Sequence, residues 1–256
     1  KTFVSQSVLD AKRLRSSEDA FVDLLFAAAP RLGMPLLAAK MPRAYVDLNR
    51  STEELDPALI EGARRRGQNP RVASGLGVIP RVVSNGRAIY SGKITMQEAR
   101  MRIDDYWFPY HTALQRLLNA AHTRFGEAIL IDCHSMPHEA IENCSPQREK
   151  RPEIVLGDRF GAAADGSIVD EIEAAFAEAG FRVARNSPFA GAYITQTYGR
   201  PFRQQHAIQV EIDRSLYMDE ANIAPNAEFE AIRARLTQAL QRISGLRKDQ
   251  KPMAAE

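Results

Sequence analysis

The 256-residue chain carries 34 Lys and Arg against 32 Asp and Glu, so its formal charge is only +2 at pH 7. This balance, without a long run of one sign, argues against a surface that follows a phosphate backbone, and no apolar stretch approaches the roughly 18 residues of a membrane span. Two cysteines, Cys133 and Cys144, are too few for a disulfide framework. We therefore expect a cytoplasmic protein that binds neither nucleic acid nor membrane.

The length suits one large domain with a substantial core. Pro and Gly are spread along the chain, and neither a repeat nor a low-complexity linker divides it. We predict a single domain over residues 1–256. The chain opens on "KTFVSQSVLD" without an initiator Met or a signal-peptide pattern, so we expect that residues upstream of Lys1 were lost or left out.

The first half of the chain is predicted to hold two helical regions around an extended stretch. "SSEDAFVDLLFAAAPRLG" has capping residues at Ser16 and Ser17 and predicts a helix that stops near Gly33. "MPLLAAKMPRAYVDLNR" predicts extended chain, with two candidate strands in or near it. "TMQEARMRIDDYWFPYHTALQRLLNAAHTRFG" predicts a long helical region, bent or interrupted near Pro109 and ending at Gly126.

Strands alternate with helices in the second half. "EAILIDCH", "RVARN" and "QHAIQVEID" predict strands, and "DGSIVDEIEAAFAEAGF" predicts a helix closed by Gly180. The last helix, from Asn226 to about Ser244, is amphipathic. This alternation predicts a three-layer α/β/α fold, with helices on both faces of a mainly parallel or mixed central sheet.

The strand "AILIDCH" ends in polar residues, and the carboxyl ends of strands line ligand crevices in such sheets. Side chains alternate along a strand, so Asp132 and His134 should share one side and Cys133 the other. A His with an acid two residues earlier suits a metal ligand or a general base, and a His that only caps the strand end stays an open alternative. A thiol nucleophile at Cys133 is disfavoured against a buried, inert Cys.

Two further segments carry candidate site residues. In "PRAYVDLNR" an extended chain would place Arg43, Asn49 and two intervening polar residues on one side, followed by Arg50, as in a carboxylate clamp. The alternative is a surface strand whose arginines pair with helix acids.

In "QHAIQVEID" an alternating pattern gives Gln209, Glu211 and Asp213 one face. Glu211 is then a candidate general base, and the alternative is an edge strand with its acids in water.

Weaker signals come from lone histidines and from one loop. His111 and His206 are each more often structural than catalytic in such positions. "NSPFAGAYITQTYG" has the small residues of a loop that approaches a ligand closely, which makes Thr195 and Tyr198 candidates for substrate contact.

The order of these motifs closely resembles the N-formylglutamate amidohydrolase family. The resemblance spans roughly Ser17 to Glu220 and includes "PRAYVDLNR", "GLGVIPR", "PYHTAL", "IDCHSMP", "VLGDRFG", "RNSPFAGAYIT", "YGRP" and "QVEIDRSLYMDE". That family is similar to the zinc carboxypeptidases and to the aspartoacylase and succinylglutamate desuccinylase group. The resemblance therefore implies a fold like that of the zinc carboxypeptidases.

The resemblance also implies roles for individual residues. His134 would be a zinc ligand and Glu211 the general base or proton shuttle. Arg43 would polarise the scissile carbonyl or hold substrate, while Asn49 and Arg50 would grip a substrate carboxylate. The implied reaction is zinc-dependent cleavage of N-formyl-L-glutamate to formate and glutamate, the last step of one histidine-degradation route.

One part of the family pattern is missing. Family members resemble one another in a "PHSG" segment whose His would be another zinc ligand, and this chain has no such segment. We expect it upstream of Lys1, on a first strand, so that one zinc per chain would be completed by an acid from "SSEDAFVD". Asp19 is the first choice, before Glu18 and Asp23, and the alternative for such an acid is charge complementarity at a helix start.

Two other functions stay open at this stage. The same fold could hydrolyse another N-acyl amino acid, such as N-formylaspartate or an N-acetylated or N-succinylated acid. A catalytically silent homologue could instead bind an acidic amino-acid derivative through Arg43, Asn49 and Arg50. The oligomeric state is not indicated, and the loop over residues 135–152 is equally well a fixed wall or a lid.

Overall fold

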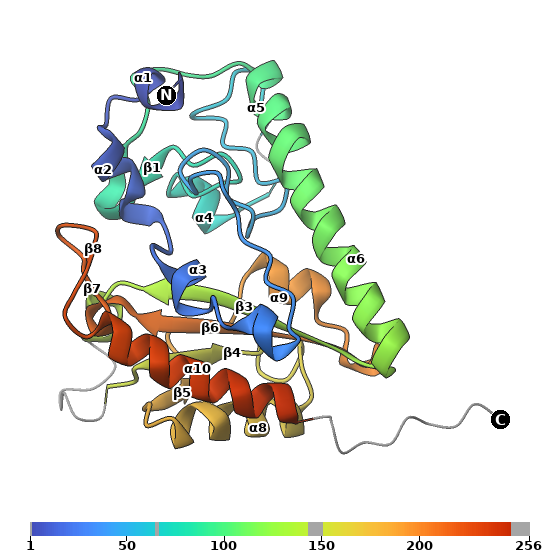
Figure 1. Cartoon of the computed structure of the whole chain (residues 1–256). Helices are drawn as coiled ribbons and strands as arrows, with labels where there is room; N and C mark the ends of the chain where they lie inside the picture. Colours follow the sequence, from blue (N-terminus) through green and yellow to red (C-terminus); the bar gives the residue numbers. More distant parts are fainter. Residues whose placement is uncertain (1, 65–66, 143–150, 247–256) are drawn as a thin grey trace. The chain divides into compact units, whose positions relative to one another are not determined.

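The computed structural model describes residues 2–64, 67–142 and 151–246. They fold into two compact units, each built from two stretches of chain (Figure 1). The first unit comprises Lys1–Glu18 and Ala39–Arg116, and the second comprises Asp19–Ala38 and Leu117–Glu256. The single domain predicted over residues 1–256, with a first strand upstream of Lys1, stays a prediction.

The second unit is organised around a four-stranded mixed sheet. Its strands are β3 (Ala128–Met136), β4 (Ile154–Gly157), β5 (Val183–Arg185) and β6 (Gln205–Asp213), in the order β3-β6-β4-β5. Strand β6 runs parallel to β3 and antiparallel to β4, and β4 runs parallel to β5. The sequence did not predict β4, because a short run with all four residues buried lacks alternation.

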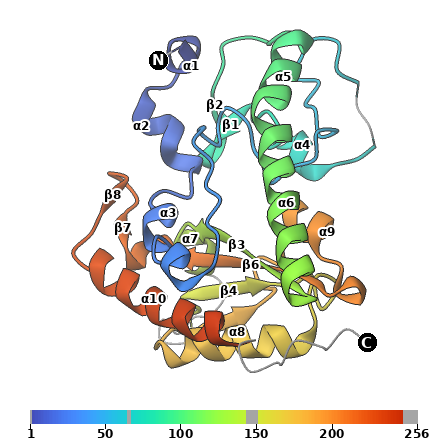
Figure 2. The ribbon, with the colours of Figure 1, turned by 45° about the vertical axis from the view of Figure 1, so that its right-hand side comes forward.

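Helices cover both faces of this sheet, which confirms the predicted three-layer fold. Helices α3 (Val22–Leu25), α8 (Gly166–Glu178) and α10 (Phe229–Gly245) pack on one face (Figure 1). Helix α9 (Tyr193–Tyr198) and the end of α6 (Phe108–Phe125) lie on the other face (Figure 2). The unit also contains η2 (Ala29–Leu32), α7 (Glu139–Glu142), η6 (Pro201–Arg203), η7 (Arg214–Leu216), β7 (Met218–Asp219) and β8 (Ala224–Pro225).

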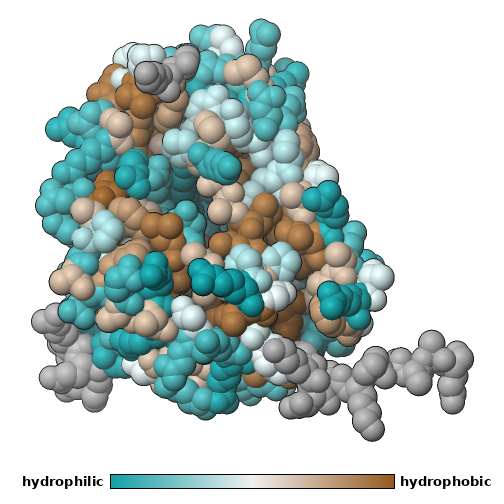
Figure 3. All heavy atoms as spheres, viewed as in Figure 1, coloured by the Kyte–Doolittle hydropathy of each residue, from teal (hydrophilic) through white to brown (hydrophobic). Residues whose placement is uncertain are grey.

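The two long helices on the first face follow from their apolar spacing. Helix α10 buries Phe229, Ile232, Leu236, Leu240 and Ile243 at intervals of three or four residues. Its remaining positions are mostly polar and exposed, so hydrophilic side chains predominate over this helix in Figure 3. Each buried side chain of this size contributes about 1.5–3 kcal/mol through its removal from water.

Short elements and irregular chain make up most of the first unit. They are α1 (Thr2–Gln6), α2 (Ala11–Leu14), η1 (Arg15–Ser17), α4 (Pro70–Ala73), β1 (Val82–Val83), η3 (Ser84–Gly86), β2 (Arg87–Ala88), α5 (Met96–Arg102) and the start of α6. A small core of Leu14, Ala44, Val83 and Ile89 holds segments far apart in sequence together. Strands β1 and β2 pair as an antiparallel hairpin.

The long helical region is interrupted close to Pro109, as predicted. Between α5 and α6 lies a π-helical turn, Ile103–Trp107, in which the Phe108 N–H bonds the Ile103 carbonyl. Proline has no N–H and crowds the carbonyl four residues before it, so a wider turn just upstream relieves both conflicts. The helix ends at Gly126, whose φ of +73° suits a residue without Cβ.

The predicted helix from Ser16 to Gly33 is wrong except at its end. The chain forms η1, an extended residue at Glu18, the four-residue α3 and then η2, which stops at Gly33. Phe21 has a left-handed φ of 65°, and one such residue breaks a helix. The Asp19 side chain accepts a hydrogen bond from the Ser135 N–H, at the end of β3.

The two strands predicted in or near "MPLLAAKMPRAYVDLNR" are also wrong, since the structure has no strand in this segment or directly beside it. Around the site residues of this segment the chain turns, and the N–H groups of Tyr45 and Val46 donate to the Pro42 carbonyl. Asp47 accepts a bond from the Asn49 N–H, which offers the backbone an alternative to a sheet ladder. Strand alternation therefore does not describe how Arg43 and Asn49 are placed.

Gly157, at the end of β4, gives a test of the sheet packing. A Cβ at this residue would lie 2.7 Å from backbone atoms of Ala190 and Gly191, whereas a Cβ at Gly166 would meet nothing within 4 Å. We expect Gly157→Ala to lower the free energy of unfolding by about 1–3 kcal/mol in urea titrations, since fixed backbone atoms must shift. Gly166→Ala, in the first turn of α8, should be neutral or raise it by up to about 1 kcal/mol. Equal effects of the two substitutions would contradict this packing.

Candidate functional site

The register between β3 and β6 sets the candidate site of the second unit. The parallel pairing aligns Asp132 with Gln209 and His134 with Glu211. Aligned residues of neighbouring strands point to the same face, while Ile208, Val210 and Ile212 point into the core on the other face. The predicted alternation of β6 is thus confirmed. The alternative of an edge strand with its acids in water is wrong, because β6 lies between β3 and β4 and Glu211 is only 8% exposed.

Two carboxylates hold the imidazole of His134. Its Nδ1 lies 3.0 Å from Asp19 Oδ2, and its Nε2 lies 3.0 Å from Asp132 Oδ1. Burial by itself would lower the pKa of His134, but the two carboxylates outweigh burial and hold this pKa well above its usual range. His134 and Asp132 share one side of β3, as predicted, and metal ligation by His134 stays a prediction.

Asp19 is tied to the end of β3 by further bonds. Its Oδ1 accepts from the Ser135 N–H at 2.8 Å and from the Ser135 hydroxyl at 3.2 Å. The competing acids are placed differently, since Glu18 pairs with Arg15 at 2.8 Å and Asp23 is exposed. Asp19 is therefore the acid of "SSEDAFVD" that meets His134, and it does so from an irregular segment without any helix start.

Arg214 was not identified from the sequence, yet it belongs to this cluster. The residue is 7% exposed, and its Nε donates to the Ser135 hydroxyl at 3.0 Å. One terminal nitrogen lies 4.0 Å from Asp19 Oδ1. The guanidinium thus supports the carboxylate that contacts His134. The sequence feature that could have identified Arg214 is its position directly after the last residue of a predicted strand, in "EIDRS".

The side chains of His134, Asp19 and Asp132 meet some of the requirements of a metal site. Two ligands of tetrahedral zinc with bonds of about 2.0 Å lie about 3.3 Å apart, close to the 3.0 Å between His134 Nδ1 and Asp19 Oδ2. Asp132 on the second ring nitrogen matches the carboxylate that orients many metal-bound histidines. Within the described ranges, no group of three His, Cys, Asp or Glu side chains could hold a metal. These residues would therefore supply two ligands and their support, short of the three that catalytic zinc takes from protein.

A chain of hydrogen bonds positions Glu211. Its Oε1 accepts from Gln209 Nε2 at 2.8 Å, and Gln209 Oε1 accepts from the Ala192 N–H at 3.1 Å. Because the amide oxygen of Gln209 is held by a backbone donor, its NH₂ group must face Glu211. This arrangement fixes the carboxylate on the sheet face that also carries His134.

The two residues predicted to touch substrate in α9 are buried. Thr195 is 0% exposed, and its hydroxyl donates to the Ala192 carbonyl. Tyr198 is 6% exposed, and burial raises the pKa of its phenol to about 12. The segment expected as a loop is thus half loop and half helix. Substrate contact by Thr195 and Tyr198 stays a prediction.

In the first unit, Asp47 organises the predicted carboxylate clamp. Its Oδ2 accepts from Arg43 Nε at 3.1 Å and lies 3.9 Å from Arg50 Nε, and its Oδ1 accepts from the Asn49 N–H at 2.9 Å. Arg50 also donates to the Asn49 and Leu76 carbonyls. Burial would raise the pKa of Asp47, but the guanidinium groups of Arg43 and Arg50 lower it overall. Both arginines therefore pair with Asp47, an acid of their own irregular segment.

The remaining candidates have structural surroundings. Cys133 packs against the core on the face opposite His134, and burial raises the pKa of its thiol, which disfavours a nucleophile. His111 Nε2 lies 2.9 Å from the Leu48 carbonyl, and fully buried His206 accepts from the Asp165 N–H. Cys144 and residues 143–150 of the predicted lid or wall lie outside the described residues.

Comparison with known proteins decides the family. The model of the N-formylglutamate amidohydrolase family matches residues 1–218. The chain belongs to this family of amidohydrolases. It is 32% identical over 243 residues to an N-formylglutamate deformylase of Pseudomonas aeruginosa, with 93% of this chain and 85% of the relative covered. A deformylase of Pseudomonas putida is 31% identical over 222 residues, covering 85% and 76%.

A solved structure agrees with the fold of this family member. The crystal structure of an N-formylglutamate amidohydrolase from Ralstonia eutropha JMP134 is 37% identical and superposes with a TM-score of 0.87. The match covers 94% of this chain and 87% of that one. The predicted α/β fold and the predicted family are thus confirmed. In addition, none of the described helices is both long enough and apolar enough to traverse a lipid bilayer.

The lowered pKa of Asp47 predicts how the clamp of this amidohydrolase responds to pH. A folded pKa below the ordinary value near 3.8 means that Asp47 stabilises the fold above that pH, and that this stability is lost as the pH falls through the folded pKa. We expect Asp47→Asn to lower the free energy of unfolding by roughly 1–3 kcal/mol at pH 7, because Arg43 and Arg50 lose their buried partner. Urea titrations at pH 7 and pH 3.5 should show a smaller difference from wild type at pH 3.5. A difference that does not change with pH would contradict the role given to the carboxylate charge.

Proposed function

We propose that the chain hydrolyses the amide bond of N-formyl-L-glutamate, with zinc, to formate and L-glutamate. The observation that carries this proposal is the cluster on one sheet face, where Asp19 meets His134 and the β3–β6 register sets Glu211 beside it. Relatives at 31% and 32% identity are named N-formylglutamate deformylases, which supports the choice of substrate.

In this proposal His134 Nδ1 and Asp19 hold the metal, with Asp132 and Arg214 as their supports. A third protein ligand is proposed in the "PHSG" segment that the family resemblance implies. Bound zinc would polarise the formyl carbonyl and make a bound water a nucleophile near neutral pH. The His134 ring is fixed by Asp132 at its second nitrogen, so its orientation does not depend on the metal alone.

Glu211 is proposed to move the proton. It would accept a proton as a water molecule attacks the formyl carbon, and it would pass this proton to the leaving amine nitrogen when the carbon–nitrogen bond breaks. The hydrogen bond from Gln209 keeps its carboxylate in place during both transfers. Burial of Glu211 to 8% exposure keeps bulk water from competing for the proton.

Arg43, Asn49 and Arg50 are proposed to bind substrate through its oxygen atoms. Arg supplies paired donors that match the two oxygens of a carboxylate, and the bonds to Asp47 fix two of these side chains in advance. Arg43 would hold or polarise the scissile carbonyl, while Asn49 and Arg50 would grip a carboxylate. We further propose that the reaction is the last step of a histidine-degradation route and takes place in the cytoplasm.

A formate-release assay on N-formyl-L-glutamate tests the proposal. We expect wild-type protein to release formate, and Glu211→Gln to lower kcat by about 10²–10⁴-fold, because the amide can neither accept nor pass on the proton. Glu228→Gln makes the same change on the exposed start of α10 and should leave the rate within about twofold.

The outcome also separates the rival functions. Wild-type protein that ignores N-formyl-L-glutamate but cleaves an N-acetylated or N-succinylated acid would replace the substrate and keep the chemistry. Protein that binds glutamate derivatives in calorimetry and hydrolyses none of these amides would overturn the enzymatic proposal. Full activity in Glu211→Gln would remove Glu211 from the reaction.

A further inference from the structure

The turn that follows β4 holds an unusual run of backbone conformations. Arg159, Phe160 and Gly161 have φ values of +56°, +55° and +85° in succession. Only the glycine adopts this left-handed region without steric conflict, so two bulky residues are held there against their preference. Such backbone persists only where the surrounding structure imposes it, and it is concentrated at functional sites.

The surrounding bonds show what imposes this turn. The Asn186 side-chain oxygen accepts from the N–H groups of Asp158 and Phe160, and Asn186 Nδ2 donates to Asp158 Oδ1. Asp158 Oδ2 accepts from the Gly161 N–H, and the Arg159 N–H donates to the Ala190 carbonyl. Every polar group in this network serves to fix the backbone on both sides of Arg159.

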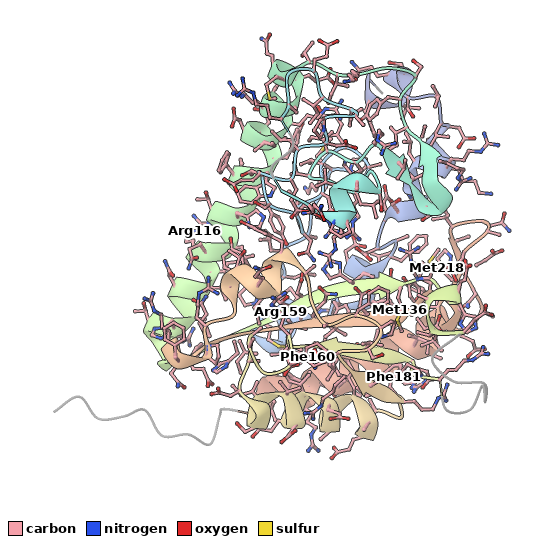
Figure 4. The ribbon with its side chains drawn as sticks, turned by 180° about the vertical axis from the view of Figure 1, so that it is seen from behind. Arg116, Met136, Arg159, Phe160, Phe181 and Met218 are labelled. Carbon is pink, nitrogen blue, oxygen red and sulfur yellow. The ribbon has the colours of Figure 1, made fainter. Side chains whose placement is uncertain are left out.

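The fixed turn places the stem of Arg159 near the proposed base. Its Cγ lies 3.2 Å from the position that a Cβ on Gly191 would occupy, and the next residue, Ala192, donates to Gln209. Gln209 in turn donates to Glu211. Figure 4 shows Arg159 beside α9, whereas Phe160, at 79% exposure, projects into solvent.

Within the part of the chain that the structure describes, the fold does not use the Arg159 guanidinium. Arg159 is partly buried, and among the described residues no acceptor bonds or pairs with its guanidinium. By contrast, Arg214 and Arg185 have acceptors within 3.0 Å. A cation on a fixed backbone, without a partner among the described residues and with its stem on the side of the sheet that carries Glu211, is suited to an anionic ligand.

We propose that Arg159 binds the side-chain carboxylate of the substrate and so selects acidic N-formyl amino acids. Gln209 is two residues from Glu211 along β6, about 6.6 Å of strand, and Gly157 lies opposite Gln209 on β4. Arg159 follows Gly157 in the chain and therefore starts from the Gln209 side of Glu211, which suits the carboxylate at the far end of glutamate. This inference rests on the proposed function.

The test compares two substrates in wild-type protein and variants. N-formyl-L-glutamine keeps the scissile amide and the α-carboxylate of N-formyl-L-glutamate but lacks the charge at the far end. We expect Arg159→Gln to lower kcat/KM for N-formyl-L-glutamate roughly 10- to 100-fold, mainly through KM, and to change N-formyl-L-glutamine less than threefold. Arg159→Lys, which keeps the charge, should recover part of the loss.

Controls separate binding from folding and from the reaction itself. Arg233→Gln removes an exposed charge from α10 and should leave both substrates unaffected. Should Arg159→Gln not fold, wild-type protein alone still decides, since less than threefold preference for N-formyl-L-glutamate would overturn the inference. Equal losses on both substrates would also overturn it. Wild-type protein inactive on N-formyl-L-glutamate would instead refute the proposed function, and the role of Arg159 with it.

Discussion

The parallel hydrogen-bond ladder between β3 and β6 is the constraint on which the candidate site depends. A slip of one residue would turn Glu211 into the core and would turn Ile208, Val210 and Ile212 out to the face that carries His134. The apolar face of β6 therefore fixes a polar arrangement on the opposite face, because burial of three aliphatic side chains specifies the register. Core packing and site geometry are two consequences of the same strand pairing.

Each group of polar side chains is completed by a residue that need not touch substrate. Asp132 and Arg214 support His134 and Asp19, Gln209 supports Glu211, and in the first unit Asp47 supports Arg43 and Arg50. Buried charges are costly unless they are paired and hydrogen-bonded, so these partners are a condition for keeping the functional groups inside the protein. They also hold the side chains in one orientation before a ligand arrives.

The alternation of strand residues and the residues that start and end helices were enough to predict the layers of the fold and the shared face of Gln209 and Glu211. They failed where side chains replace regular backbone bonding, at Asp19, whose carboxylate bonds Ser135, and at Asp47, which bonds the Asn49 N–H. They also missed Arg214 and the strained turn at Arg159, since the side chains that bond Arg214 and fix this turn lie far away in sequence. The local sequence pattern indicates the period of an element, whereas contacts between residues far apart in sequence form only in the folded chain.

The measurement that tests the account most directly is an anomalous diffraction map of the zinc-soaked protein, recorded at the zinc absorption edge. The account predicts one strong peak in contact with both His134 Nδ1 and the Asp19 carboxylate, while Asp132 still bonds the second ring nitrogen. A map without a peak at these atoms, or with zinc bound by other side chains, would contradict a metal site built on the β3–β6 register.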